Sequence, residues 1–152
     1  MKFLFISVQK TMDVIGVKCL HYQLIANSFK SSILFVPEFG EDDSFEEIGK
    51  FVDDMNPDII GFSVMTIDFN PAALLTGYLK KHSPDIPVIW GGHHPTVAPE
   101  TCVEHADFVL MGEADEAILD LANALEKKQG LENVPGLYFI KNGEIIKNNL
   151  PP

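Results

Sequence analysis

Two segments of the chain combine strand-like residues with small or polar residues that could receive a ligand. Ile86–Pro95 reads I-P-V-I-W-G-G-H-H-P, and Ser63–Met65 follows another apolar run earlier in the chain. A parallel sheet presents the carboxyl ends of its strands to ligands. Paired glycines there let a bulky group lie against the main chain, because no Cβ intervenes. Gly91 and Gly92 therefore predict a slot for a large ligand, although a double glycine also occurs in plain turns.

Two histidines follow the paired glycines, so a metal site has to be considered. His93 and His94 are adjacent, so their side chains point in different directions, and neither has a cysteine or carboxylate close by in the sequence. We therefore predict no metal site. His93 either contacts the ligand or faces solvent, and His94 is expected to cap the segment before Pro95.

The elements that must position these residues alternate between short apolar runs and segments of helical period. The runs show little period-two alternation, which is typical of strands buried on both faces. The predicted strands are Lys2–Val8, Ser32–Val36, Asp58–Val64, Pro87–Trp90 and Asp107–Met111. Alternation of strand and helix predicts an α/β fold with a flavodoxin-like, doubly wound, five-stranded parallel sheet.

The last part of the chain has a different pattern. Asn142-Gly143 stands between two apolar arms, which is typical of a hairpin with a type I′ turn. We expect a C-terminal β-hairpin attached to the sheet domain as an antiparallel appendage, followed by the start of a linker. The predicted division is residues 1–134 for the sheet domain and 135–152 for the hairpin and linker.

Four segments should converge beyond the carboxyl ends of the strands, where doubly wound sheets bind ligands. They are Gln9–Gly16, Ser63–Asp68, Gly91–Thr96 and Gly112–Glu116. The first contains no G-x-G-x-x-G, so a dinucleotide fingerprint is absent. The acidic cluster of a phospho-accepting receiver domain is also absent, because Asp13 stands nearly alone.

Composition limits the partners. The chain has 152 residues and a formal net charge of -11, which repels nucleic acid phosphates. No apolar run approaches the roughly 20 residues needed to cross a bilayer, and the short apolar start lacks the features of a signal peptide. Cys19 and Cys102 lie far apart, as expected of free thiols in a reducing cytoplasm. We expect a cytoplasmic protein that binds neither nucleic acid nor membrane.

At this point the sequence resembles the cobalamin-binding domain family, in the version that precedes radical S-adenosylmethionine enzymes. That family has a serine, any residue and a leucine-like residue after the third strand, and Gly-Gly after the fourth. Ser63–Met65 and Gly91-Gly92 match this pattern, with methionine in place of leucine. The radical-enzyme version adds further motifs, which match Gly91–Thr96, Pro99-Glu100 and Gly112–Glu116. The resemblance spans the whole chain.

One departure from the wider family concerns the ligand of cobalt. The methyltransferase and mutase branches carry D-x-H-x-x-G after the first strand, and its histidine replaces the nucleotide base beneath cobalt. The corresponding segment, Gly16–His21, reads G-V-K-C-L-H, so none of the three residues stands at its required place. The resemblance therefore implies cobalamin bound base-off with no protein histidine on cobalt, and His21 is expected to be an ordinary helix residue.

The resemblance also indicates which residues contact the cofactor. Small strand-end residues would admit the nucleotide tail, hydroxyls would donate hydrogen bonds, and the loop after the first strand would lie under the corrin. The expected contacts are Gln9, Lys10, Gly16, Val17, Ser63, Val64, Met65, Thr66, Gly91, Gly92, His93, Gly112 and Glu113. Two of these have structural alternatives: Lys10 as a solvated charge, and Glu113 as a partner of backbone amides at a helix start.

The expected function is that of a cobalamin-binding module working with a radical S-adenosylmethionine catalytic domain in the same polypeptide. That domain would hold S-adenosylmethionine and an iron-sulfur cluster, which needs three cysteines at C-x-x-x-C-x-x-C spacing that this chain lacks. We expect no catalytic residue in this chain, and a methyltransferase or cyclase as the parent enzyme. The alternatives are a signalling or interaction domain of the same fold without a cofactor, and a flavin carrier, for which the turn after the first strand lacks the expected phosphate-binding residues.

Overall fold

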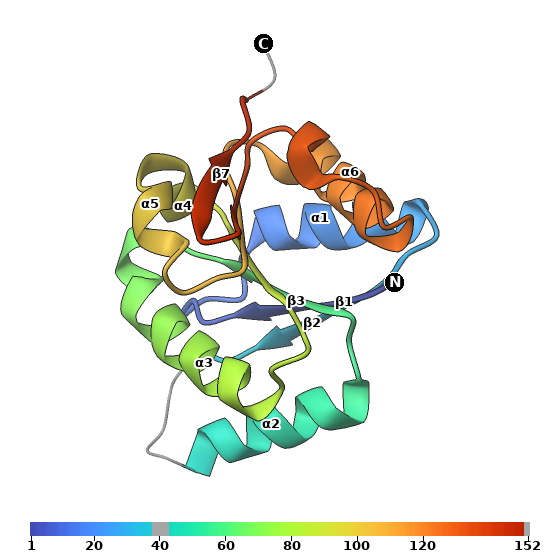
Figure 1. The fold of residues 1–152 in the computed structure, drawn as a ribbon. Coiled ribbons are helices and arrows are strands. Elements are labelled where there is room, and N and C mark those ends of the chain that lie inside the picture. Colours follow the sequence, from blue (N-terminus) through green and yellow to red (C-terminus); the bar gives the residue numbers. More distant parts are fainter. Residues whose placement is uncertain (38–42, 151–152) are drawn as a thin grey trace.

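The sheet is the centre of the computed structural model, which describes residues 1–37 and 43–150. It is one mixed sheet of seven strands in the order β2-β1-β3-β4-β5-β6-β7 (Figure 1). The first five strands run parallel, whereas β6 pairs antiparallel with β5 and β7 pairs antiparallel with β6. The strands are β1 (Lys2–Ser7), β2 (Lys30–Phe35), β3 (Ile59–Ser63), β4 (Val88–Gly91), β5 (Phe108–Leu110), β6 (Leu137–Lys141) and β7 (Glu144–Lys147).

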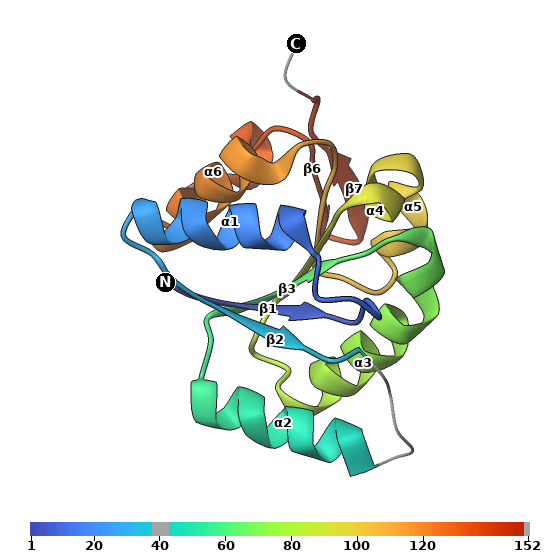
Figure 2. The ribbon, with the colours of Figure 1, turned by 180° about the vertical axis from the view of Figure 1, so that it is seen from behind.

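Helices cover both faces of this sheet. Figures 1 and 2 show α1 and α6 together on one face and α2 and α3 on the other. Two short helices follow β4, and single 3-10 turns precede α3 and β6. The helices are α1 (Ile15–Ala26), α2 (Asp43–Met55), α3 (Phe69–His82), α4 (His93–Val97), α5 (Pro99–Cys102) and α6 (Ala114–Glu126), and the 3-10 turns are η1 (Thr66–Asp68) and η2 (Leu131–Asn133).

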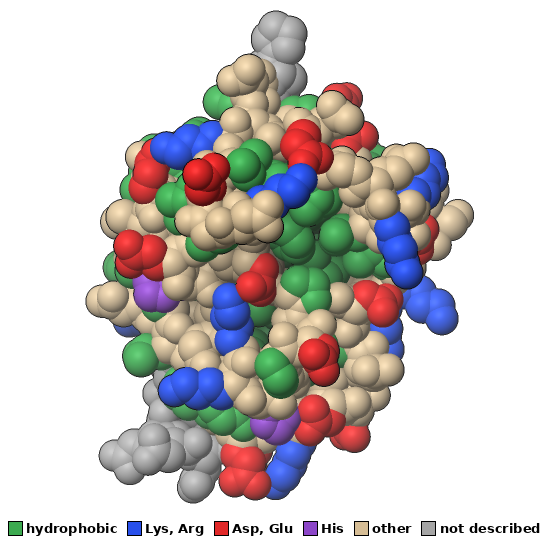
Figure 3. All heavy atoms as spheres, viewed as in Figure 1, with side chains coloured by type: hydrophobic (Ala, Val, Ile, Leu, Met, Phe, Trp, Pro, Cys, Tyr) green, Lys and Arg blue, Asp and Glu red, His purple; other side chains and the backbone are tan. Residues whose placement is uncertain are grey.

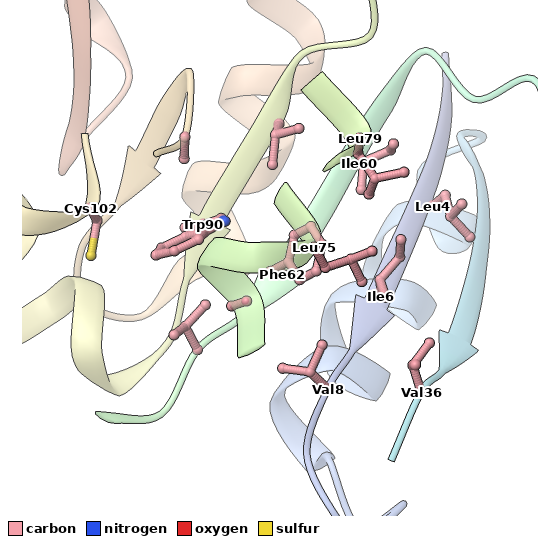
Figure 4. Packing of buried hydrophobic residues seen from close by; sticks show 14 of the residues in the cluster. Leu4, Ile6, Val8, Val36, Ile60, Phe62, Leu75, Leu79, Trp90 and Cys102 are labelled. Atoms are coloured by element: carbon pink, nitrogen blue, oxygen red, sulfur yellow. The ribbon is translucent and has the colours of Figure 1, made fainter. Parts of the chain in front are cut away.

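Each face of the sheet has its own hydrophobic core. The core under α2 and α3 contains Leu4, Ile60 and Trp90, and the close packing of its side chains is shown in Figure 4. The indole N–H of Trp90 donates to the Thr76 hydroxyl at 3.0 Å, which satisfies the one polar group of this large buried ring. The core under α1 and α6 contains Phe5 among its buried residues. Alternating strand residues thus supply two separate cores.

The structure confirms the predicted α/β fold and corrects the place of the C-terminal hairpin. The hairpin is not an appendage to a five-stranded parallel sheet, because β6 pairs with β5 and extends the sheet to seven strands. Leu137 and Phe139 of β6 are buried in the core under α1 and α6. Their burial and the pairing of the edge of β5, a strand of three residues, together hold the hairpin in the sheet.

The face that carries the hairpin is chemically mixed. Figure 3 shows charged side chains around a hollow of hydrophobic side chains beside β7 and below α6. Ile140 and Ile145 of the hairpin are exposed.

None of the helices within residues 1–37 and 43–150 has the length and apolar character needed to cross a bilayer.

Candidate functional site

A cavity of about 330 Å³ opens at the carboxyl end of the parallel strands, between α1, α6 and the sheet. Its volume falls at the lower end of the range of small-molecule sites, roughly 300–1,000 Å³. Ligands bind doubly wound sheets in this position, where the connections after neighbouring strands leave toward opposite faces. The lining residues are Phe5, Gly16, Val17, Cys19, Leu20, Gly61, Phe62, Ser63, Ile89, Gly91, Gly92, Leu110, Gly112, Glu113, Ala114, Asp115 and Ile118.

Glycines form the part of the wall contributed by the end of β4. Gly92 has a φ of +104°, and a Cβ at this position would lie 3.0 Å from the Ser63 hydroxyl oxygen and 3.0 Å from the Val64 nitrogen. A side chain there would be strained and would also crowd the end of β3. At Gly91 a Cβ would approach only the Leu110 carbonyl oxygen, at 3.7 Å. The missing side chains therefore keep this wall open.

A second glycine position shapes the floor of the cavity. Gly61 lies in the middle of β3, and a Cβ there would stand 2.7 Å from the ring of Phe5 on the neighbouring strand. The ring of Phe5 thus lies directly over Gly61. Because Gly61 has no side chain, the ring of Phe5 has room to lie close to the sheet.

The Thr96 hydroxyl joins the two glycine turns that border the cavity. It donates to the Gly92 carbonyl at 2.8 Å and accepts from the Gly112 N–H at 3.0 Å. Gly112 follows β5 with a φ of +74°. One side chain in α4 therefore fixes the turn after β4 relative to the turn after β5.

The polar lining residues lie at the opening of the cavity. Cys19 on α1 and Glu113 and Asp115 at the start of α6 are exposed, and Ser63 at the end of β3 is half-buried. No side chain caps the start of α6, so its first backbone N–H groups face this region. The described residues contain no group of three or more histidine, cysteine, aspartate or glutamate side chains that could hold a metal ion.

The structure places the predicted contact residues in two groups. Seven line the cavity: Gly16, Val17, Ser63, Gly91, Gly92, Gly112 and Glu113. Six lie outside its lining: Gln9, Lys10, Val64, Met65, Thr66 and His93.

The six residues outside the lining have distinct surroundings. Val64 is fully buried, and its backbone N–H and C=O pair with Gly91 and His94. The Gln9 amide donates to the Ser63 carbonyl at 3.5 Å, at the edge of the site. Lys10, Met65, Thr66 and His93 are exposed at the same end of the sheet.

Two other histidines have hydrogen-bond partners away from the cavity. Nδ1 of His21 lies 3.0 Å from the hydroxyl of Ser31, at the β2 side of α1. Nδ1 of His94 lies 3.2 Å from the hydroxyl of Thr66, and its Nε2 lies 3.3 Å from that of Thr101. Within the described part of the chain, the cavity wall contains no histidine.

The sequence interpretation missed the apolar inner wall. Its members lie within strands or helices, where apolar residues are ordinarily read as core: Phe5, Leu20, Gly61, Phe62, Ile89, Leu110 and Ile118. Ala114, the first residue of α6, was also missed. The interpretation also missed the polar lining residues Cys19 and Asp115. Gly61 carried a usable signal, because a glycine inside a strand often marks the close approach of another group.

Comparisons with known proteins agree with this geometry. The model of the B12 binding domain matches residues 1–122. An uncharacterized methyltransferase of Pyrococcus horikoshii is 28% identical over 123 residues, covering 79% of this chain and 26% of that protein. An anaerobic magnesium-protoporphyrin IX monomethyl ester cyclase of Rubrivivax gelatinosus is 23% identical over 129 residues, covering 80% and 23%. The chain thus spans about a quarter of the length of these curated relatives.

A solved structure shares the fold. The radical S-adenosylmethionine methyltransferase TsrM from Kitasatospora setae, with cobalamin and a 4Fe-4S cluster bound, aligns with a TM-score of 0.85 at 17% identity. The alignment covers 100% of this chain and 30% of that one. At this identity the likeness concerns the fold alone, whereas the family model covers most of the sequence. The resemblance indicated by the sequence motifs is confirmed, and the chain belongs to the B12-binding domain family.

Proposed function

We propose that this chain holds cobalamin base-off, with the nucleotide tail in the cavity between α1 and α6, for a radical S-adenosylmethionine domain of the same polypeptide. The observation that carries the proposal is the cavity itself. It opens at the carboxyl ends of β3, β4 and β5, and Gly91, Gly92 and Gly112 line it without side chains. A nucleotide tail needs such an open path between strand ends.

The surroundings of the histidines support cobalt held without a protein histidine. His21 is turned toward Ser31 on β2, and His94 lies between two threonine hydroxyls. In this proposal the loop between β1 and α1, which includes Gln9 and Lys10, faces the lower side of the corrin. Gly16 and Val17 at the start of α1 would then border the tail, and Ser63 would donate a hydroxyl hydrogen bond to it.

When bound, cobalamin would supply the methyl-transfer chemistry of its cobalt. This chain's own residues bind and orient the cofactor, and none of them is assigned a catalytic role. The length of the relatives supports a separate catalytic part, since this chain covers 30% of the methyltransferase that holds both cobalamin and an iron-sulfur cluster. In this division residues 1–134 hold the cofactor, the hairpin within residues 135–152 completes their sheet, and the segment after β7 leads toward the catalytic domain, in a cytoplasmic enzyme.

Titration with hydroxocobalamin tests this function. We expect the purified chain to bind one equivalent and to show the absorbance spectrum of the base-off form, because the cavity would hold the nucleotide base away from cobalt. The spectrum after gel filtration gives both occupancy and coordination state. A protein that retains no cobalamin would contradict the proposed function. A base-on spectrum would contradict the base-off arrangement, and a histidine-bound spectrum would contradict cobalt held without a protein histidine.

A pair of glycine variants tests the location. Gly16 lines the cavity, Gly77 lies on α3 at the other face of the sheet, and a Cβ at either position meets nothing within 4 Å. Both substitutions to leucine should be tolerated, since leucine favours helix by up to about 1 kcal/mol over glycine. We expect Gly16→Leu to weaken cobalamin binding by about tenfold or more, because the leucine side chain would occupy part of the cavity. The binding free energy lost with those apolar contacts exceeds roughly 1.4 kcal/mol, which corresponds to a tenfold change in the dissociation constant. Gly77→Leu should bind like the parent, and equal affinities of the two variants would place the tail elsewhere.

A further inference from the structure

The inner wall of the cavity differs from its opening in chemical character. Phe5, Ile89, Leu110 and Ile118 line the inner wall and are only 3%, 3%, 1% and 1% exposed. They come from β1, β4, β5 and α6 and carry no hydrogen-bonding side-chain atom. The polar lining residues are instead exposed or half-buried, so they lie nearer to solvent.

The two interior strands β3 and β4 add no free backbone hydrogen-bonding groups at Gly61 and Ile89. β3 pairs with β1 and β4, and β4 pairs with β3 and β5. The N–H and C=O groups of these interior strands are therefore used in the sheet ladder. Gly61 and Ile89, which line the inner cavity, lie in these two strands.

The floor of the cavity suits a flat aromatic group. The ring of Phe5 lies over Gly61, so an aromatic surface faces the cavity close to the sheet. A planar ring placed there gains stacking or edge contacts with Phe5 in addition to burial of its apolar area. The side chains of Phe5, Ile89, Leu110 and Ile118 offer no donor or acceptor for polar ring atoms.

We infer that the inner wall selects cobamides, the class of corrinoids that includes cobalamin, by their lower base, and that it favours dimethylbenzimidazole or a phenol over a purine. This rests on the proposed function, because it assumes that the tail enters the cavity. A purine carries ring nitrogens and, in adenine, an amino group, and these lose water on entry without gaining a partner. We expect roughly tenfold or greater discrimination, as in sites where a polar group is buried unpaired.

The direct test compares three cobamides that differ only in the base: dimethylbenzimidazole, p-cresol and adenine. Dissociation constants of the purified chain are measured by calorimetry. We expect the adenine form to bind about tenfold or more weakly than the other two. Adenine leaves cobalt more readily than dimethylbenzimidazole, and this alone would favour base-off binding of the adenine form. Weaker binding of the adenine form therefore cannot come from its cobalt coordination. Equal or tighter binding of the adenine form would overturn the inference, whereas failure of all three to bind would instead overturn the proposed function.

A matched pair of variants assigns the selectivity to the wall. Ile89→Thr places a hydroxyl in the inner wall, and Ile60→Thr makes the same change at a buried strand position in the core of the opposite face. Both lower stability through the same loss of a buried side chain. The dissociation constant of the adenine form divided by that of the dimethylbenzimidazole form should fall several-fold in Ile89→Thr and stay unchanged in Ile60→Thr. An unchanged ratio in Ile89→Thr, or an equal change in both variants, would contradict the assignment. The comparison of the three cobamides uses only the parent chain, so it tests the inference even if neither variant folds.

Discussion

At the scale of single residues, Thr96 connects two turns whose positions decide the width of the cavity. Its hydroxyl bonds to Gly92 and Gly112, and both glycines have positive φ angles. Thr96→Val keeps the branched shape and removes both hydrogen bonds, each worth about 0.5–1.5 kcal/mol. We expect cobalamin binding to weaken by about tenfold, measured by titration of the purified chain.

Two companion variants separate positioning from general loss of stability. Thr96→Ser retains the hydroxyl and should restore affinity close to that of the parent. Thr101→Val also removes a hydroxyl, which contacts the Ala98 carbonyl at 2.8 Å and Nε2 of His94 at 3.3 Å. Thr101 lies outside the cavity lining, so this variant should leave affinity unchanged. If Thr96→Ser binds as weakly as Thr96→Val, the hydroxyl does not set the turn geometry.

The sequence predicted the residues that stand out chemically at strand ends. Gly91, Gly92 and Gly112 combine with apolar runs in a pattern that indicates a turn beside a ligand, and all three line the cavity. Phe5 and Ile118 could not be found in this way, because a core residue and a cavity-lining residue have the same apolar character. Which of them lines a cavity depends on the distance between α1 and α6, and periodicity does not encode that distance.

At the scale of elements, the short turn after β3 carries an internal electrostatic cost. Asp68 closes η1 with only 8% of its surface exposed. Burial raises the pKa of this carboxyl above its ordinary value of 3.8, and a hydrogen bond to the Met65 backbone partly opposes the shift. The folded chain therefore binds this proton more tightly than the unfolded chain does, so its contribution to stability is lost as pH rises through the raised pKa.

The variant Asp68→Asn tests this cost. We expect the variant to have a higher free energy of unfolding than the parent at neutral pH, with the difference shrinking as pH falls through the raised pKa and levelling off below the ordinary carboxyl pKa of about 4. Urea unfolding at pH 7 and in the acid range measures the effect. Asp54→Asn, at an exposed position on α2, serves as the control and should follow the parent at each pH. A variant less stable than the parent at neutral pH would show that the charged form is favoured here.

The hairpin shows where pattern reasoning about elements ends. Asn142-Gly143 predicted the turn, and both residues have positive φ angles. Local sequence does not say which edge a hairpin joins, since pairing with β5 depends on contacts between segments distant in the chain. The burial of Leu137 and Phe139 under α6 decides the outcome. The strands β1 to β5 were easier to predict, because runs buried on both faces alternate with helices.

At the scale of the whole molecule, the two faces of the sheet are built differently. The core under α2 and α3 is filled by large side chains such as Trp90 (Figure 4). The core under α1 and α6 instead borders the cavity. Each of these two faces of the sheet has one of the two cysteines. Cys19 is exposed and lines the cavity, while Cys102 is buried in the filled core. Burial also raises the pKa of the Cys102 thiol, which lowers its reactivity.

The most direct test of a cofactor tail in this cavity is the rate at which a maleimide labels Cys19, followed by mass spectrometry with and without saturating methylcobalamin in the dark. Cys102 serves as the internal control, since its burial keeps it unlabelled in the folded chain. We predict that bound cobalamin slows labelling of Cys19 by about tenfold or more, because the tail covers the mouth of the cavity. Cobalamin that binds the chain while Cys19 labels at an unchanged rate would contradict the account, because the tail would then lie outside the space between α1 and α6.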